Sequence, residues 1–117
     1  MDICFALALS SAVLLRVPAP LTLSWQHSVE HFRIEEDYGV RGDALVLAEV
    51  RTQGVGAGID VPRDARFEGG WWRFTPAVPA LPHVQLANST YVTGYTLCSV
   101  QGCEHLAGGQ VLVMRPC

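Results

Sequence analysis

Apolar and polar side chains alternate between Leu21 and Glu30, and this pattern constrains the fold more than any other. One side of the alternation carries Leu21, Leu23, Trp25, His27 and Val29. Successive side chains of a β-strand point to opposite faces of a sheet, so the pattern predicts a half-buried strand over residues 21–31.

Short strand-like runs separated by turn residues make up the rest of the chain. We expect further strands over residues 33–40, 44–50, 71–74, 83–87, 91–97 and 111–114. Arg41-Gly-Asp43 predicts a turn that makes a hairpin of the first two, and Gly39 predicts a bulge or bend. No useful stretch shows a helical period. The sequence therefore predicts an all-β fold, either a single small antiparallel β-sandwich or a partly open β-barrel.

Length and charge limit the function classes. The chain has 117 residues, half of them hydrophobic, which fits one domain over residues 1–117. The formal net charge is −3, and the eight basic residues are all arginines scattered along the chain. Because a nucleic-acid-binding surface needs clustered positive charge, we expect no nucleic-acid partner.

The first twenty residues have two interpretations. Ile3 to Leu15 is apolar but is interrupted at Ser10-Ser11, which favours an N-terminal hairpin within residues 1–20. A signal or membrane-anchor segment is the alternative, although no basic residue precedes the apolar run. The run is too short to cross a bilayer as a helix, so no transmembrane span is expected.

Ionisable residues are densest between residues 27 and 36. His27, Glu30 and Glu35 are candidate catalytic residues for a hydrolase or a metal-dependent enzyme. His27 and His31 are candidate zinc ligands, because two imidazoles and a carboxylate can hold that metal. His27 lies on the apolar side of the predicted strand, where a histidine is more often a structural core residue. Ser28 is its immediate neighbour and would point to the opposite face, so a direct Ser28–His27 dyad is not expected.

Glycines and tryptophans add a possible contact surface. The glycine-rich stretch Gln53-Gly-Val-Gly-Ala-Gly58 predicts a strained turn, or a nest of backbone amides that binds an anion. A dinucleotide-binding loop is not expected, because Pro62 follows too soon for the helix that such a loop needs. Trp71 and Trp72 must point to opposite faces, so one is expected in the core and the other near the surface. The candidate ligand-binding residues are Trp25, His27, Ser28, Glu30, Glu35, Glu36, Gly56, Gly58 and Trp72. No cofactor is predicted.

The four cysteines bear on the compartment. Cys98 and Cys103 are spaced to face each other across a hairpin as a disulfide. Cys4 and Cys117 are either unpaired or joined to each other if the chain ends meet. An oxidised Cys98–Cys103 pair would favour a periplasmic or membrane-associated location, and a reduced pair would favour the cytoplasm.

The motifs together resemble a bacterial family, the Domain of Unknown Function 1850 family. The residues that carry the resemblance are Trp25-Gln-His-Ser-Val-Glu30, Glu35-Glu36, Gly56-Ala-Gly58, Gly70-Trp71-Trp72, Leu97-Cys98 and Gly102-Cys103. The similarity covers residues 3 to 105, and the tail over residues 106–117 departs from the family pattern. The resemblance implies strands rather than a signal at the N-terminus.

The same resemblance implies a possible role without implying an activity. Genes of the family often lie beside those of TAXI-class TRAP-type solute transporters. The implied function is a small binding or accessory module whose partner is a membrane transporter subunit or its organic-acid solute. An enzyme that uses the His27–Glu30 motif is the alternative.

Overall fold

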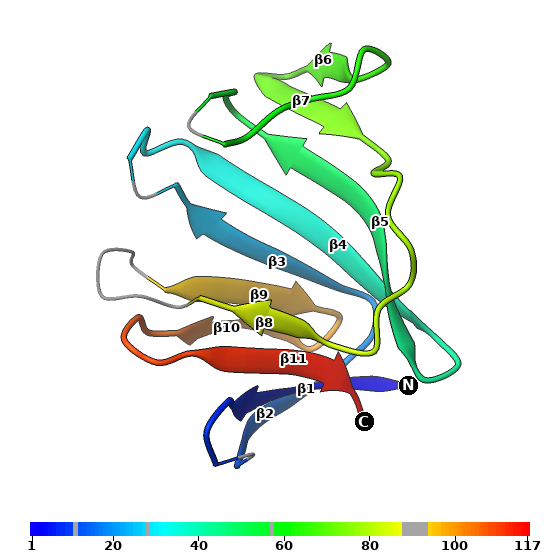
Figure 1. The fold of residues 1–117 in the computed structure, drawn as a ribbon, viewed down its shortest axis with the longest axis vertical. Helices are drawn as coiled ribbons and strands as arrows, with labels where there is room; N and C mark the ends of the chain where they lie inside the picture. Colours follow the sequence, from blue (N-terminus) through cyan, green and yellow to red (C-terminus); the bar gives the residue numbers. More distant parts are fainter. Residues whose placement is uncertain (11, 28, 57, 88–93) are drawn as a thin grey trace.

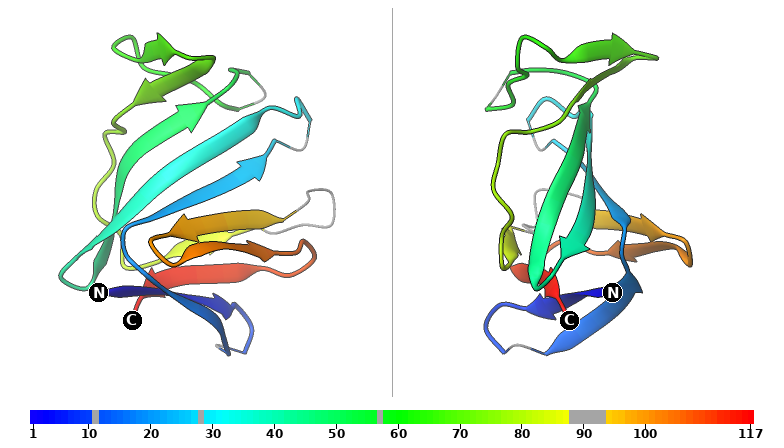
Figure 2. Two further views of the ribbon diagram at one scale, coloured as in Figure 1. Left: turned by 180° about the vertical axis from the view of Figure 1, so that it is seen from behind. Right: turned by 90° about the vertical axis from the view of Figure 1, so that its right-hand side faces the viewer.

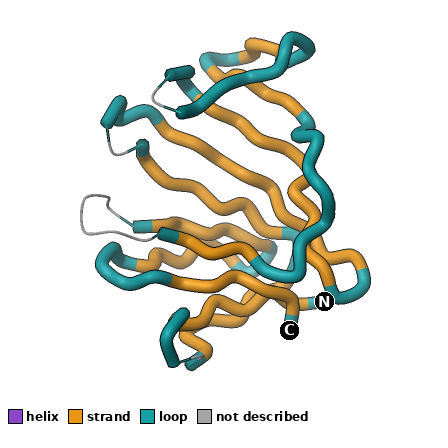
Figure 3. Tube along the Cα trace, in the orientation of Figure 1, coloured by secondary structure: helices purple, strands orange, loops and turns teal. Residues whose placement is uncertain are grey.

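The computed structural model describes residues 1–10, 12–27, 29–56, 58–87 and 94–117. Within these residues the chain forms eleven β-strands and no helix (Figures 1 and 3). The strands are β1 (Asp2–Leu7), β2 (Val13–Pro18), β3 (Leu21–Gln26), β4 (Arg33–Arg41), β5 (Ala44–Thr52), β6 (Arg66–Glu68), β7 (Trp71–Phe74), β8 (Val84–Leu86), β9 (Tyr95–Ser99), β10 (Gly102–Leu106) and β11 (Leu112–Pro116).

The strands form two antiparallel sheets. The smaller sheet has the order β2-β1-β11-β8, and the larger has the order β10-β9-β3-β4-β5-β7-β6. Neither sheet closes into a barrel, so the predicted all-β sandwich is confirmed. The smaller sheet lies against one end of the larger one, and the β6–β7 hairpin lies at the opposite end of the molecule (Figures 1 and 2).

The core lies between the two sheets. From β1 and β11 it receives Phe5 and Met114, and from β3 it receives Leu23, all three with no exposed surface. Burying an aliphatic or aromatic side chain of this size contributes about 1.5–3 kcal/mol. The alternation in β3 therefore has the predicted effect: Leu21 and Leu23 face the core, while Thr22 contacts Asp37 on the opposite face.

The predicted strand over residues 21–31 is wrong beyond Gln26, where β3 ends. A compact turn follows, in which the backbone N–H of His27 donates to the carbonyl of Phe32 (2.8 Å) and that of His31 donates to the carbonyl of His27 (3.0 Å). The side chain of His27 accepts further backbone hydrogen bonds within the turn. Local side-chain-to-backbone bonding of this kind competes with a continuing strand.

A bulge in β5 sets which side chains face outward. Asp37 of β4 pairs with Glu49 and Tyr38 pairs with Leu47, so Ala48 is an extra residue without a partner across the ladder. An extra residue reverses the alternation of side chains. Consequently Leu47 lies on the core face, whereas Glu49 lies on the outer face. The sequence prediction placed a bulge or bend at Gly39; Gly39 instead pairs regularly with Val46.

The two ends of the chain meet in the smaller sheet. Strands β1 and β2 pair as an antiparallel hairpin, and β11 lies between β1 and β8. Cys4 and Cys117 form a disulfide, and Cys98 and Cys103 form another across the β9–β10 hairpin. With all four cysteines paired, the protein is suited to an oxidising environment.

Candidate functional site

Strand β4 distributes its acidic residues between the two faces of the larger sheet. Glu35 and Asp37 point outward, where they contact arginine side chains of neighbouring strands. Glu36 points inward, between Leu23 of β3 and Val50 of β5. The neighbouring acids therefore take part in two separate sites, one on each face.

Glu36 is a partly buried carboxyl group among apolar neighbours. Its Oε1 accepts a hydrogen bond from the hydroxyl of Tyr38 at 3.3 Å. Burial raises the pKa of Glu36 to about 7, although the Tyr38 hydrogen bond acts in the opposite direction. The side chain is thus half-protonated near neutral pH and can either donate or accept a hydrogen bond.

Aromatic side chains lie on the same face of the larger sheet as this carboxyl group. The rings of Trp25 and Tyr95 have their centroids 5.6 Å apart at an interplanar angle of 57°. Burial raises the pKa of Tyr95, and the charge of Glu36 raises it further. Burial raises the pKa of Tyr38 as well, and the charge of Glu36 is again the next cause. We call Trp25, Glu36, Tyr38 and Tyr95 the inner acid cluster.

Glu36 of the inner acid cluster has no basic side chain as a partner among the described residues. Among the residues that the structure describes, no arginine, histidine or chain terminus forms an ion pair with Glu36. Buried carboxyl groups are usually paired or hydrogen-bonded several times, because desolvation of the charge is costly. A carboxyl group with one hydroxyl partner therefore has bonding capacity left for a ligand.

The outer face holds a different arrangement centred on Arg51. Its guanidinium donates to both carboxylate oxygens of Asp37 (2.7 and 2.8 Å), to Glu35 (3.0 Å) and to Glu49 (3.3 Å). Arg73 of β7 donates to the same Glu49 at 2.9 Å. We call Thr22, Glu35, Asp37, Glu49, Arg51 and Arg73 the outer charge network.

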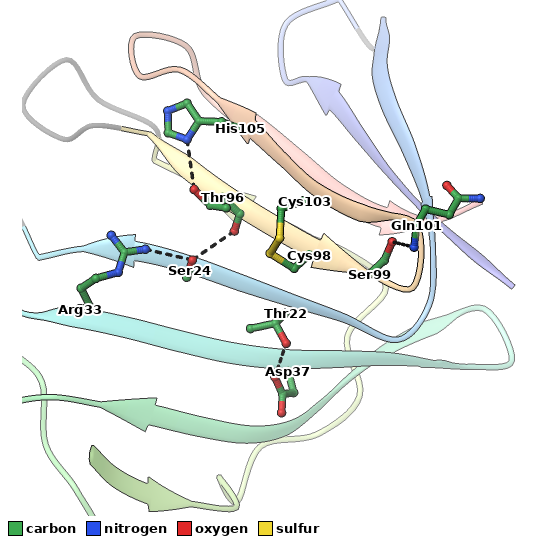
Figure 4. Close-up of a disulfide and its surroundings, with 10 residues drawn as sticks. All are labelled: Thr22, Ser24, Arg33, Asp37, Thr96, Cys98, Ser99, Gln101, Cys103 and His105. Atoms are coloured by element: carbon green, nitrogen blue, oxygen red, sulfur yellow. Dashed lines mark hydrogen bonds between the residues drawn. A yellow bond between two sulfur atoms is a disulfide. The ribbon is translucent and has the colours of Figure 1, made fainter. Parts of the chain in front are cut away.

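Other polar side chains extend this face toward β9 and β10. Thr22 donates to Asp37 at 2.7 Å, and Ser24 accepts a hydrogen bond from Arg33 at 3.1 Å (Figure 4). The Cys98–Cys103 disulfide lies beside them on β9 and β10 (Figure 4). These hydrogen bonds satisfy the polar groups mutually, which is typical of a structural network rather than a reactive centre.

The pKa shifts of Asp37 and Arg51 agree with a structural role for the outer charge network. The hydrogen bond from Arg51 holds the pKa of Asp37 below its ordinary range, with a further contribution from Thr22. Asp37 in turn makes the largest contribution to raising the pKa of Arg51. Bidentate contacts of this geometry are among the stronger polar interactions in proteins.

We expect the Arg51→Met substitution to lower the free energy of unfolding by about 2 kcal/mol at neutral pH, because three carboxylates lose their shared cation. The loss is below that of a fully buried pair, since these acids are about a third exposed. An Asp with a lowered pKa contributes stability above its unfolded-state pKa and loses it as pH falls through the folded-state pKa. The difference between variant and wild type should therefore shrink in urea unfolding at about pH 3.

The matched control is Arg66→Met. Arg66 lies 3.5 Å from Glu68, and their side chains are 68% and 51% exposed, so its loss should change the stability by less than about 0.5 kcal/mol. Equal effects of the two variants at neutral pH would contradict a stabilising role for the outer charge network.

His27 serves the turn that follows β3. Its Nδ1 accepts the backbone N–H groups of Val29 (3.1 Å) and Glu30 (3.2 Å), and its ring packs on Phe32 with centroids 5.2 Å apart. An accepting Nδ1 requires the neutral tautomer with the proton on Nε2. His27 thus holds the turn together from a half-buried position after β3, not from the core position on a strand that the sequence predicted.

The predicted catalytic and metal-binding residues fall into two groups, because His27, Glu30 and His31 share the turn after β3 and Glu35 does not. Glu30 and His31 are exposed on the turn, whereas Glu35 is bound to Arg51 on the outer face. Among the described residues, no three His, Cys, Asp or Glu side chains gather as a metal site. Ser28 lies outside the described residues.

The glycine-rich loop meets this turn at one end of the larger sheet. Phe32 packs so closely on Gly54 that an added Cβ would lie 2.7 Å from its ring. Gly56 and Gly58 have φ angles of 111° and 92°, which favour glycine. The turn after β3 and the glycine-rich loop therefore meet where Phe32 contacts Gly54.

The two tryptophans of β7 are both partly exposed, so neither has the fully buried position predicted for one of them. Trp72 packs edge-on against Phe67, with ring centroids 5.0 Å apart, and lies opposite Thr52 of β5. That pairing places Trp72 on the same face of the larger sheet as Glu36.

Several residues of both sites were missed by sequence reasoning. These are Tyr38, Tyr95, Asp37, Glu49, Arg51 and Arg73. Tyr38 lies two residues from Glu36 in a predicted strand, and this spacing alone could have identified it. Asp37 lies two residues from Glu35 in the same strand, whereas the others come from strands whose register the sequence did not reveal.

Comparison with known proteins identifies the family. No helix of the described residues is long and apolar enough to cross a membrane. Neither the curated proteins nor the solved structures include one that matches the chain. The family model described as Domain of unknown function (DUF1850) matches residues 21–106, which is most of the chain, and the protein therefore belongs to the DUF1850 family.

Proposed function

We propose that this protein is a ligand-binding module and that its inner acid cluster binds a short organic acid. The observation that carries the proposal is Glu36, a partly buried carboxyl group with one hydroxyl partner and no ion pair to a described residue. Trp25 and Tyr95 supply apolar and aromatic surface beside it. Binding sites of this kind combine an apolar lining with few polar groups that fix the ligand.

The chemistry favours an acid when Glu36 is protonated. A neutral Glu36 can donate its proton in a hydrogen bond to a ligand carboxylate, and the hydroxyl of Tyr95 is a further donor. Charge-assisted hydrogen bonds to a carboxylate are stronger than neutral ones. Ionised Glu36 would instead repel the ligand, so affinity should fall as pH rises through about 7.

The proposed partner is a TAXI-class TRAP-type transporter. The family resemblance suggests this association, and organic acids are the solutes that it implies. The two disulfides support a periplasmic or membrane-surface location for the module. The glycine-rich loop and the turn over residues 27–32 are then the candidate surface for contact with the transporter subunit.

Thermal unfolding with acetate, pyruvate, succinate and glutarate, at about pH 6 and about pH 8.5, tests the ligand class. At 100 times its Kd, a ligand stabilises the folded protein by about 2.7 kcal/mol, which raises the Tm by about 10 °C for a domain of this size. We expect at least one acid to do so at the lower pH, with a much smaller shift at the higher pH. Glu36→Gln should bind independently of pH, since its amide donates in both conditions.

The matched control is Glu68→Gln, an exposed acid on β6 that should leave binding unchanged. No shift with any acid would refute the proposal, and stronger binding of an amine such as putrescine at high pH would reassign the ligand class.

The enzyme alternative is tested by His27→Ala. A variant that folds but no longer binds zinc, where the wild type does, would favour that alternative; a variant that fails to fold would support the structural role.

A further inference from the structure

The outer face of the smaller sheet includes Ala6, Val113 and Gln85. Phe5 and Leu7 of β1 face the core, so the alternation turns Ala6 outward. On the neighbouring strands, Ala6 pairs with Val113 of β11, which in turn pairs with Gln85 of β8. Two adjoining hollows of about 570 and 280 Å³ lie here and share Leu7 and Ala8 in their linings.

The larger hollow is uncharged. It lies between the tip of the β1–β2 hairpin and the segment before β11, and its lining includes Leu9, Gln85, Gly109 and Val111. Leu9 is fully exposed and Val111 is 43% exposed. Exposed apolar side chains around a hollow of this size are typical of a site for an apolar group.

The smaller hollow has a basic end. Its lining includes Arg115 and His83 and no acidic residue. The guanidinium of Arg115 donates to the backbone carbonyl of Pro116 at 3.4 Å, and within the described chain it forms no ion pair. The hollow beside Arg66 and Arg73 differs in this respect, because both of those arginines already have acidic partners.

We propose that this surface binds a single-chain anionic amphiphile, with a free fatty acid as its occupant. The hydrocarbon chain would lie in the larger hollow along Ala8 and Leu9, and the carboxylate would meet Arg115 and His83. This assignment rests on the arrangement of the two hollows. The larger, apolar hollow adjoins the smaller one, which contains Arg115, a cation that has no carboxylate partner among the described residues. The site is separate from the inner acid cluster, which lies between other strands.

The test measures binding of octanoate, decanoate and dodecanoate by isothermal titration calorimetry, below their micelle-forming concentrations. The full chain is used with both disulfides intact. We expect saturable binding of one molecule, with the affinity rising by about fourfold for each added methylene group. Arg115→Gln should weaken binding by about tenfold or more, because a charge-assisted hydrogen bond is lost. Ala8→Trp should abolish it by filling the larger hollow.

Arg63→Gln is the matched control, since it removes an exposed arginine outside this surface and should leave binding unchanged. Glu36→Gln should also bind dodecanoate normally, which separates this site from the proposed organic-acid site. Equal affinity for dodecanoate in the wild type and in Arg115→Gln would overturn the proposal. The absence of dodecanoate binding would also overturn the proposal. If the protein then attached to phosphatidylcholine vesicles and Leu9→Ser abolished that attachment, the surface would contact a bilayer instead.

Discussion

Replacing Cys4 and Cys117 together by alanine is expected to lower the free energy of unfolding by about 4–5 kcal/mol. The Cys4–Cys117 disulfide joins residues 113 positions apart, nearly the whole chain. Cross-linking so long a loop removes much of the conformational entropy of the unfolded chain. Alanine is preferred because Cys4 is buried, and a serine hydroxyl would add an unpaired polar group. Equilibrium unfolding in urea, followed by tryptophan fluorescence, measures the loss.

The other disulfide supplies the control. Cys98 and Cys103 are five positions apart, and the same entropy argument gives about 2 kcal/mol for so short a loop. The Cys98→Ala/Cys103→Ala variant should therefore unfold at a higher urea concentration than the Cys4→Ala/Cys117→Ala variant. Equal losses would show that loop length does not decide the contribution of these bonds.

Glu36→Gln should change how stability depends on pH. Burial raises the pKa of Glu36 from 4.5 to about 7, so the folded protein holds this proton more tightly than the unfolded chain. Where the folded state binds more protons, stability falls as pH rises. The wild type should therefore lose about 3 kcal/mol between about pH 4.5 and about pH 7, at about 1.4 kcal/mol for each pKa unit. The glutamine variant should lack this loss and should gain stability relative to the wild type at high pH.

Urea unfolding at about pH 5 and about pH 8 measures the difference between the two proteins. The useful quantity is the change in that difference, because other ionisable groups act equally on both proteins. The exposed Glu68→Gln variant should follow the wild type at both pH values. A difference between Glu36→Gln and wild type that stays constant from pH 5 to pH 8 would place Glu36 in a hydrated environment and remove the main support for the organic-acid site.

The strands and turns could be predicted from the sequence because each depends on residues that are adjacent in the chain. Alternation from Leu21 to Gln26 identified β3, and the strand expected over residues 33–40 matches β4. The Arg41-Gly-Asp43 turn joins β4 and β5 as expected. The same reasoning extended β3 too far, because it could not include the hydrogen bonds of the His27 side chain to the backbone.

The sites required information that neighbouring residues do not contain. The bulge at Ala48 shifts Glu49 and Arg51 outward, and only the register with β4 reveals it. Tyr95 reaches the surroundings of Glu36 from a strand that is distant in sequence and pairs with β3. A pattern with a period of two gives the face of a side chain but not its partner across the ladder.

The sequence by itself thus determined that this chain is an all-β protein of the DUF1850 family, with its ionisable residues densest between residues 27 and 36. The tertiary structure decided that Glu36 is partly buried beside Tyr38 and that Arg51 binds three carboxylates. It also decided that β11 inserts beside β1, which brings Cys117 to Cys4. The physical reason is that strand identity follows from local side-chain periodicity, whereas pairing, burial and charge compensation depend on residues that only folding brings together.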